Sequence, residues 1–233
     1  MVVNAPANFD DLARWYRWLE YLAFGRALER CRFALLPELA EARRVLILGE
    51  GDGRFLRELV DLNAEARVDV VEASGAMVDL ARGRLSEDER GRVCFHRADA
   101  REWNFPLEQY DAVVTCFFLD CFNEVTLARL MPRISASVCP DGRWLMAEFV
   151  ASGNWRSGMW LAALHGFFRG VTGLEAKRLA NFGGLLAGLG WEEKRRMEFA
   201  GGLMAARVWE AAFFPRERVN CGLNSLATMV AGA

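Results

Sequence analysis

The sequence predicts an α/β fold, built on a doubly wound and mostly parallel sheet of seven strands with an antiparallel hairpin at its C-terminal end. Three observations support this prediction. Five short apolar runs alternate with stretches of helical periodicity between residues 44 and 149, as expected for parallel strands buried on both faces. A glycine-rich turn, Gly49-Glu50-Gly51-Asp52-Gly53, follows the first run. Two further extended stretches flank Gly201-Gly202, which indicates a hairpin.

The first 40 residues are expected to form a helical segment in front of the main domain. Apolar and aromatic side chains recur at helical spacing over residues 9–36, and Pro37 limits the C-terminal end of this helix. The helix would either pack on the main domain or form a lid over a ligand, and the two interpretations are compatible. Its aromatic residues include Trp15, Tyr16, Trp18, Tyr21 and Phe24.

Strands and helices then alternate through the main domain, for which we expect the boundaries 41–212. The expected strands are residues 44–48, 68–72, 93–96, 112–117 and 143–149, and the helices between them are 54–63, 77–85 and 124–138. A turn at Pro140-Asp141-Gly142 leads into the fifth strand.

A different pattern follows the fifth strand. Helices are expected at residues 155–171 and 176–189, and the two strands of the hairpin at 191–199 and 203–209. Residues 213–233 form a weakly patterned tail that we expect to be poorly ordered.

Composition argues against several classes of partner. The 233 residues carry a formal net charge of -2, and the short run Lys194-Arg195-Arg196 is interpreted as a solvated face, so no nucleic acid is expected. The sequence contains neither a secretory signal nor a run of ~18 apolar residues, which predicts a cytoplasmic protein without a membrane partner. Six cysteines without a CxxC pair and only two histidines predict no metal site.

The loop after the first strand is the strongest functional signal. Gly49, Gly51 and Gly53 allow a sharp turn and a close approach of a ligand to the backbone. The loop also lies at the carboxyl end of a parallel strand, where open α/β sheets bind ligands. A dinucleotide-binding loop would read GxGxxG, but its third glycine would fall at Arg54. The GxGxG spacing therefore fits a pyrophosphate poorly.

Acidic residues follow the next two strands. Glu72 ends the second strand, where a carboxylate can accept hydrogen bonds from both ribose hydroxyls of a nucleoside. Nicotinamide and adenosylmethionine proteins both use this device, and an exposed acid at a strand end is the alternative interpretation. Asp99 follows the third strand and would accept from an adenine amino group or cap a helix or turn. With the glycine loop, these acids predict a nucleoside site.

The order of these motifs resembles that of the class I S-adenosylmethionine-dependent methyltransferases, whose fold is Rossmann-like. The matching segments are VLILGEGDGRF at the loop, VDVVEAS at the second strand, RADA after the third, YDAVVTCFFLDCF around the fourth and CPDGRWLMAEF at the fifth. That family also inserts an antiparallel strand beside the fifth, as the hairpin predicts here. The resemblance extends from residue 45 to residue 209.

This resemblance implies S-adenosylmethionine as cofactor and assigns roles to the matching positions. The loop glycines would contact the methionine portion, Glu72 the ribose and Asp99 the adenine, while Met77 would pack near the adenine or simply fill the core. The full set of expected cofactor-binding residues is Gly49, Glu50, Gly51, Gly53, Glu72, Ala73, Met77, Asp99, Ala100 and Cys116.

One position departs from the family pattern. The family usually has an acid two residues before the first loop glycine, where it helps to order the loop and the amino-acid end of the cofactor, but this chain has Ile47. Glu50 or Asp52 would take over part of that task. The absence of this acid is also compatible with a family member that has lost its activity.

The methyl acceptor is expected just beyond the fourth strand. Asp120 is the candidate general base by position, although it would equally cap the helix that follows Asn123. His165 lies on an aromatic helix that would face the acceptor, or it is a packed surface histidine. The resemblance also implies a tyrosine of the N-terminal helix over the cofactor, for which Tyr21 is preferred to Tyr16. Cys116 and Cys121 are interpreted as core thiols rather than nucleophiles.

Three functions remain open from the sequence. The first is a methyltransferase that acts on a small apolar or aromatic acceptor. The second is a non-catalytic adenosylmethionine-binding or regulatory protein, which the Ile47 departure permits. The third is an NAD(P)-dependent oxidoreductase, against which the loop spacing argues. Aromatic elements near both ends of the chain are consistent with a homodimer.

Overall fold

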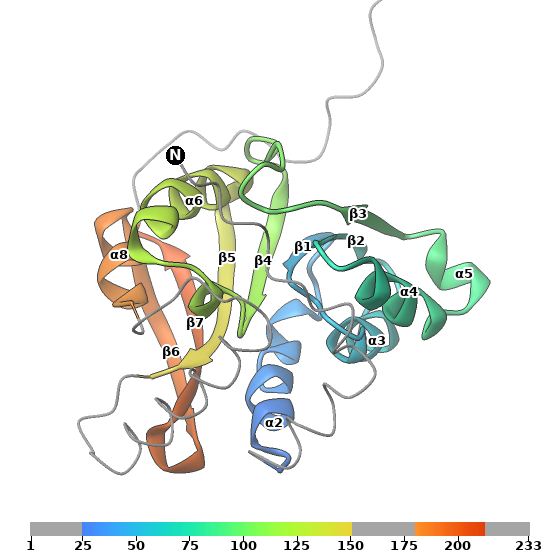
Figure 1. Cartoon of the computed structure of the whole chain (residues 1–233), viewed down its shortest axis with the longest axis horizontal. Coiled ribbons are helices and arrows are strands. Elements are labelled where there is room, and N and C mark those ends of the chain that lie inside the picture. The colour runs from blue at the N-terminus through green and yellow to red at the C-terminus, as the bar shows by residue number, and fades with distance from the viewer. Residues whose placement is uncertain (1–24, 151–179, 213–233) are drawn as a thin grey trace, which may run out of the picture.

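The computed structural model describes residues 25–150 and 180–212, and it contains the predicted seven-stranded sheet (Figure 1). The strand order is β3-β2-β1-β4-β5-β7-β6, with β7 antiparallel to both β5 and β6 and the strands from β1 to β5 parallel. The predicted fold class is therefore confirmed. The strands are β1 (Arg44–Leu48), β2 (Arg67–Glu72), β3 (Val93–Arg97), β4 (Tyr110–Cys116), β5 (Val138–Phe149), β6 (Trp191–Phe199) and β7 (Met204–Ala211).

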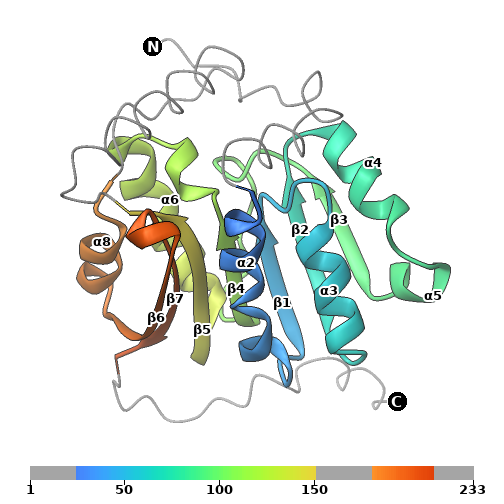
Figure 2. The same cartoon turned by 90° about the horizontal axis from the view of Figure 1, so that it is seen from below.

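Helices cover both faces of the sheet (Figure 2). Side chains of β1 show why its sequence is a continuous apolar run. Val45 and Ile47 belong to the core cluster under α2 (Ala27–Phe33) and α3 (Arg54–Leu62). Leu46 and Leu48 belong to the opposite cluster, which α6 (Glu124–Ser137) and α8 (Phe182–Gly188) complete. Because successive side chains of a strand point to opposite faces, all four are buried.

The described part of the N-terminal segment packs on this sheet. Leu28 and Cys31 of α2 and Leu39 of the short 3-10 helix η1 (Leu36–Leu39) join the core cluster on the α3 side. Pro37 stands at the start of η1, where its missing N–H is not needed. The aromatic stretch from Trp15 to Phe24 lies outside the described residues.

Two short helices connect β2 to β3. α4 (Gly75–Gly83) covers most of the expected 77–85 helix but starts two residues earlier, since Ser74 caps it by accepting from the Met77 N–H at 3.2 Å. α5 (Glu87–Arg90) is an additional turn that the periodicity did not predict, and a capping box between Ser86 and Glu89 closes its first turn.

The start of the fifth strand differs from the prediction. We expected a separate turn at residues 140–142, but β5 begins at Val138 and carries an irregularity there. Tyr110 pairs with Val138 and Ala112 with Arg143, so the extra residues of β5 bulge out of the ladder. A Cβ on Gly142 would lie 2.5 Å from a methyl carbon of Val138, which explains the glycine at this bulge.

The hairpin closes the sheet as expected. β6 and β7 are joined by η3 (Ala200–Gly202), in which Gly201 and Gly202 have φ angles of 67° and 84°. The expected helix at 176–189 is present in part as α8, whereas residues 155–171 and the tail 213–233 lie outside the described residues. Within the described ranges, no helix is long and apolar enough to cross a membrane.

Candidate nucleoside site

The glycine loop between β1 and α3 has three left-handed glycines, each required for a different reason. Gly49, Gly51 and Gly53 have φ angles of 66°, 70° and 85°. A Cβ on Gly49 would lie 2.5 Å from the ring of Phe118, and one on Gly53 would lie 2.4 Å from the Cα of Ala81 in α4. A Cβ on Gly51 would meet no atom of the described residues within 4 Å. Gly51 thus presents bare backbone to open space, while the outer two glycines allow close packing.

Glu72 joins this loop to the end of β2. Its carboxylate accepts hydrogen bonds from the Gly51 N–H at 3.2 Å and from the Ser74 N–H at 2.9 Å. The side chain is buried, with 9% of its surface exposed. Each carboxylate oxygen has a second lone pair, so the group can hold the loop and still accept from a ligand hydroxyl.

Glu50 and Asp52 point into the protein and hold the loop from behind. Glu50 Oε1 accepts from the Leu56 N–H at 2.9 Å and so caps the first turn of α3, where the N-cap residue Gly53 has no side chain to do so. Burial raises the pKa of Glu50 to about 8, although Arg32 and the Leu56 N–H act in the opposite direction. Asp52 accepts from the guanidinium groups of Arg54 and Arg84, each at 2.9 Å.

The second predicted strand-end acid, Asp99, lies beyond β3 and already accepts hydrogen bonds. Asp99 accepts from Arg101 through the backbone N–H at 2.9 Å and through the guanidinium, and these contacts outweigh burial and lower the pKa of Asp99. Because β3, β2 and β1 are adjacent and parallel, Asp99, Glu72 and the loop share one edge of the sheet. Ala100 and Met77 are buried and Ala73 is exposed.

The loop after β4 packs directly against the glycine loop. Phe117 has a φ of 53°, which a non-glycine residue rarely adopts, and its N–H donates to the Ala147 carbonyl at 2.7 Å. The Phe118 ring lies against Gly49. The turn then enters η2 (Leu119–Cys121), which holds the predicted base Asp120 in a half-buried position.

Glu148 of β5 fixes this turn, and sequence reasoning missed it. One carboxylate oxygen accepts from the Phe118 N–H at 3.1 Å and the Leu119 N–H at 2.9 Å, and the side chain is 2% exposed. Burial and the neighbouring Asp120 raise the pKa of Glu148 well above its ordinary value, while burial raises that of Asp120 to about 6. An acid inside the apolar run Leu145-Met146-Ala147-Glu148-Phe149 was the available signal.

Arg32 of α2 is a second residue that the sequence did not single out. It is 7% exposed, and its guanidinium lies 5.6 Å from the centre of the Phe117 ring. Its positive charge acts to lower the pKa values of Glu50 and Cys116, which places it beside the glycine loop and the end of β4. Burial nevertheless dominates at Cys116 and raises the pKa of its thiol, as expected of a core cysteine. Among the many arginines of this chain, no local pattern distinguishes Arg32.

Two of the predicted catalytic residues, His165 and Tyr21, lie outside the described residues. The structure therefore brings together the glycine loop, Glu72 and the turn that holds Asp120, with Asp99 along the same sheet edge.

Comparison with known proteins agrees with this architecture. The family model described as a methyltransferase domain matches residues 45–142, from β1 through the bulge of β5. Residues 45–142 are thus similar in sequence to a methyltransferase domain. The match covers the glycine loop, both strand-end acids and the turn that holds Asp120.

Solved structures share the fold of this chain at low sequence identity. The S-adenosylmethionine-dependent methyltransferase SibL is 20% identical with a TM-score of 0.65, over 90% of this chain and 63% of SibL. Human N-acetylserotonin methyltransferase, solved with S-adenosylmethionine, is 18% identical with a TM-score of 0.64, over 86% of this chain and 56% of its own. The Burkholderia thailandensis 1,6-didemethyltoxoflavin-N1-methyltransferase is 18% identical with a TM-score of 0.59, over 91% and 94%.

The curated relatives are named as aminopropyltransferases and not as methyltransferases. Polyamine aminopropyltransferase 2 of Bacillus anthracis is 30% identical over 122 residues, which are 48% of this chain and 34% of that protein. The protein of the same name from Bacillus cereus matches similarly. The chain thus spans about a third of the length of these relatives.

Proposed function

We propose that this chain binds S-adenosylmethionine at the glycine loop and transfers its methyl group to a small apolar or aromatic acceptor. The observation that carries the proposal is the alignment of three features at the carboxyl ends of adjacent parallel strands. These are the open backbone at Gly51, the buried carboxylate of Glu72 and the carboxylate of Asp99. Open α/β sheets bind nucleoside ligands at this edge.

The residues present fit such a ligand. The amino-acid portion of the cofactor would approach Gly51, where no side chain of the described residues intervenes. Glu72 would accept from the ribose hydroxyls while it keeps its bonds to the Gly51 and Ser74 N–H groups. Asp99 would turn one oxygen from Arg101 to the adenine amino group.

Arg32 supports a donor that carries a carboxylate. A buried guanidinium beside the glycine loop suits the α-carboxylate of S-adenosylmethionine, because paired and desolvated charges interact strongly. An aminopropyl donor, which the names of the curated relatives suggest for those proteins, would have the ammonium group at this end but no carboxylate to attract the guanidinium. This charge favours methyl transfer over aminopropyl transfer.

Asp120 is proposed to take the proton of the acceptor. The cofactor supplies a methyl group on a positively charged sulfur, so the protein has to align an in-line attack and exclude water. A pKa of about 6 lets Asp120 accept a proton from a hydroxyl at neutral pH. Glu148, whose pKa burial and Asp120 raise well above its ordinary value, would hold the turn by accepting from the Phe118 and Leu119 N–H groups.

Calorimetric titration of the purified chain with S-adenosylmethionine, S-adenosylhomocysteine and NADH tests the binding step. We expect the two sulfur nucleosides to bind and NADH not to bind. Glu72→Gln should weaken nucleoside binding at least tenfold, because an amide is a poorer acceptor for two hydroxyls, whereas Glu58→Gln on the exposed side of α3 should not. Binding of NADH alone would favour the oxidoreductase and overturn the proposal.

Turnover is tested separately with methyl-labelled S-adenosylmethionine and a panel of phenols, thiols, amines and carboxylic acids. Transfer to an aromatic or apolar acceptor supports the proposal. Tight binding without transfer to any acceptor would identify the non-catalytic alternative, and transfer of an aminopropyl group would assign the activity named for the curated relatives.

We further propose that the protein is cytoplasmic and acts on small molecules without a nucleic-acid partner. We also propose that it forms a homodimer, which light scattering of the purified chain tests.

A further inference from the structure

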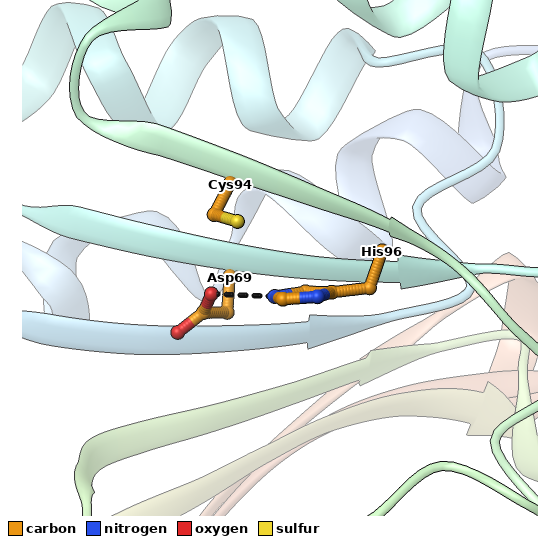
Figure 3. Close-up of side chains that lie close together, drawn as sticks. All are labelled: Asp69, Cys94 and His96. Atoms are coloured by element: carbon orange, nitrogen blue, oxygen red, sulfur yellow. Dashed lines mark hydrogen bonds and ion pairs between the residues drawn. The ribbon is translucent and has the colours of Figure 1, made fainter.

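A cluster of three metal-ligating side chains lies on the sheet away from the glycine loop. Asp69 of β2 pairs in register with Cys94 of β3, and His96 follows two residues later on the same face (Figure 3). One ligand atom of each residue lies within 4.8 Å of the others. The three come from two adjacent strands near the β3 edge of the sheet, so the backbone holds them in fixed relative positions.

We propose that Asp69, Cys94 and His96 bind a thiophilic divalent cation of the Zn²⁺ type. A thiolate, an imidazole and a carboxylate are ligands that Zn²⁺ accepts, with bonds of roughly 2.0–2.3 Å and thus ligand separations of roughly 3.3–3.7 Å. The observed ligand atoms lie within 4.8 Å of one another, so the three side chains would draw closer together around the ion. The donor set disfavours Mg²⁺ and Ca²⁺, which require mostly oxygen ligands.

Neighbouring side chains hold Asp69 and His96 in defined orientations. Asp69 Oδ1 lies 2.7 Å from His96 Nε2, and the Tyr110 hydroxyl donates to Asp69 Oδ2 at 3.1 Å. Tyr110 therefore holds the second carboxylate oxygen and leaves the first to face the cluster, as outer partners do in metal sites. On its other side, the His96 ring packs against Trp103 with a centroid distance of 5.4 Å.

Access and chemistry also distinguish this cluster from a nucleophilic site. Cys94 is exposed while Asp69 and His96 are half-buried, so an ion can enter from solvent and water can complete its coordination. A Cys-His-Asp set could also activate a thiolate, but Nε2 of His96 lies 2.7 Å from Asp69 Oδ1, so the carboxylate already engages this nitrogen. The sequence did not predict the site because Cys94-Phe95-His96 has none of the usual zinc spacings.

Cobalt titration of the full, chelator-treated chain tests the proposal without any nucleoside. We expect one equivalent of Co²⁺ to produce a thiolate-to-cobalt charge-transfer band and tetrahedral d–d bands, which Zn²⁺ then displaces. Cys94→Ser should abolish the charge-transfer band, and His96→Gln and Asp69→Asn should each weaken binding at least tenfold. Tyr110→Phe should weaken it about tenfold, as loss of an outer partner does.

Cys121→Ser is the matched control, because Cys121 is another free thiol far along the chain from the cluster. It should leave the charge-transfer band unchanged. Absence of the band in the parent chain, or its survival in Cys94→Ser, would show that the three side chains form only a hydrogen-bonded network. Circular dichroism of each metal-free variant establishes that the fold is retained, and Cys94→Ala provides a second test of the thiolate at this exposed position.

Discussion

Glu50 allows a quantitative test of how the glycine loop is held. Its carboxyl is 7% exposed, and burial raises its pKa from 4.5 to about 8. In the unfolded chain the group ionises near its ordinary pKa, so folding becomes less favourable as pH rises from about 4.5 to about 8. At 1.36 kcal/mol for each tenfold change in ionisation, the full penalty is about 5 kcal/mol.

Glu50→Gln removes this ionisation and keeps an oxygen that can accept from the Leu56 N–H. The difference in free energy of unfolding between the variant and the parent chain should be near zero at pH 4.5. At pH 8.5 the variant should be more stable by several kcal/mol. Urea unfolding at both pH values measures the difference, and the other titrating groups cancel between the two proteins. Glu50→Ala, which also loses the cap, should be about 1 kcal/mol less stable than Glu50→Gln at either pH.

Glu58→Gln is the control, because Glu58 is exposed on the same helix. As an exposed substitution it should change the free energy of unfolding by no more than about 0.5 kcal/mol. If Glu50→Gln instead lowers stability at pH 8.5, or if its effect is the same at both pH values, Glu50 is ionised in the folded protein. In that case Arg32 stabilises the Glu50 carboxylate more strongly than the structure indicates.

Three further predictions concern the loop, the core and the proposed base. Gly53→Ala should cost roughly 3 kcal/mol of stability, because its Cβ would clash with the Ala81 backbone at a φ of 85°. Gly51→Ala should cost roughly 1 kcal/mol and yet abolish nucleoside binding. Thermal unfolding measures the loss of stability, and calorimetry measures the loss of binding. Asn63→Ala should cost about 3 kcal/mol in urea unfolding, since the buried amide donates to Leu39 and Ala42 and accepts from Glu65 and Ala66. Asp120→Asn should slow methyl transfer to a hydroxyl acceptor about 100-fold and remove the rise in rate as pH increases through about 6; an unchanged pH–rate profile would exclude Asp120 as the base.

The sheet could be predicted from the sequence because its strands are buried on both faces. A continuous apolar run such as Val45-Leu46-Ile47-Leu48 is hard to place anywhere else in a protein of this composition. The glycine loop and Glu72 could also be predicted, because the loop directly follows one such run and Glu72 ends the next. The β5 irregularity was not, because Pro140-Asp141-Gly142 has the composition of a turn and only the pairing of Tyr110 with Val138 makes it a bulge.

The polar residues behind the site were harder to predict, for a physical reason. Glu148 acts on Phe118 and Leu119, which lie 29 or 30 residues away in the chain, and Arg32 acts on a loop beyond the following strand. Such contacts depend on how elements pack, which periodicity does not report. The Asp69–His96 pair is a similar case, because strand register alone brings the two side chains together.

The missing acid at position 47 acquires a structural interpretation from these contacts. Ile47 is 2% exposed and packs in the apolar cluster under α2 and α3, so a carboxylate there would need partners that this cluster does not offer. The ordering of the loop falls instead to Glu50, which caps α3, and to Asp52, which binds Arg84. Since the loop keeps its three left-handed glycines under this different support, the Ile47 substitution is no argument against nucleoside binding.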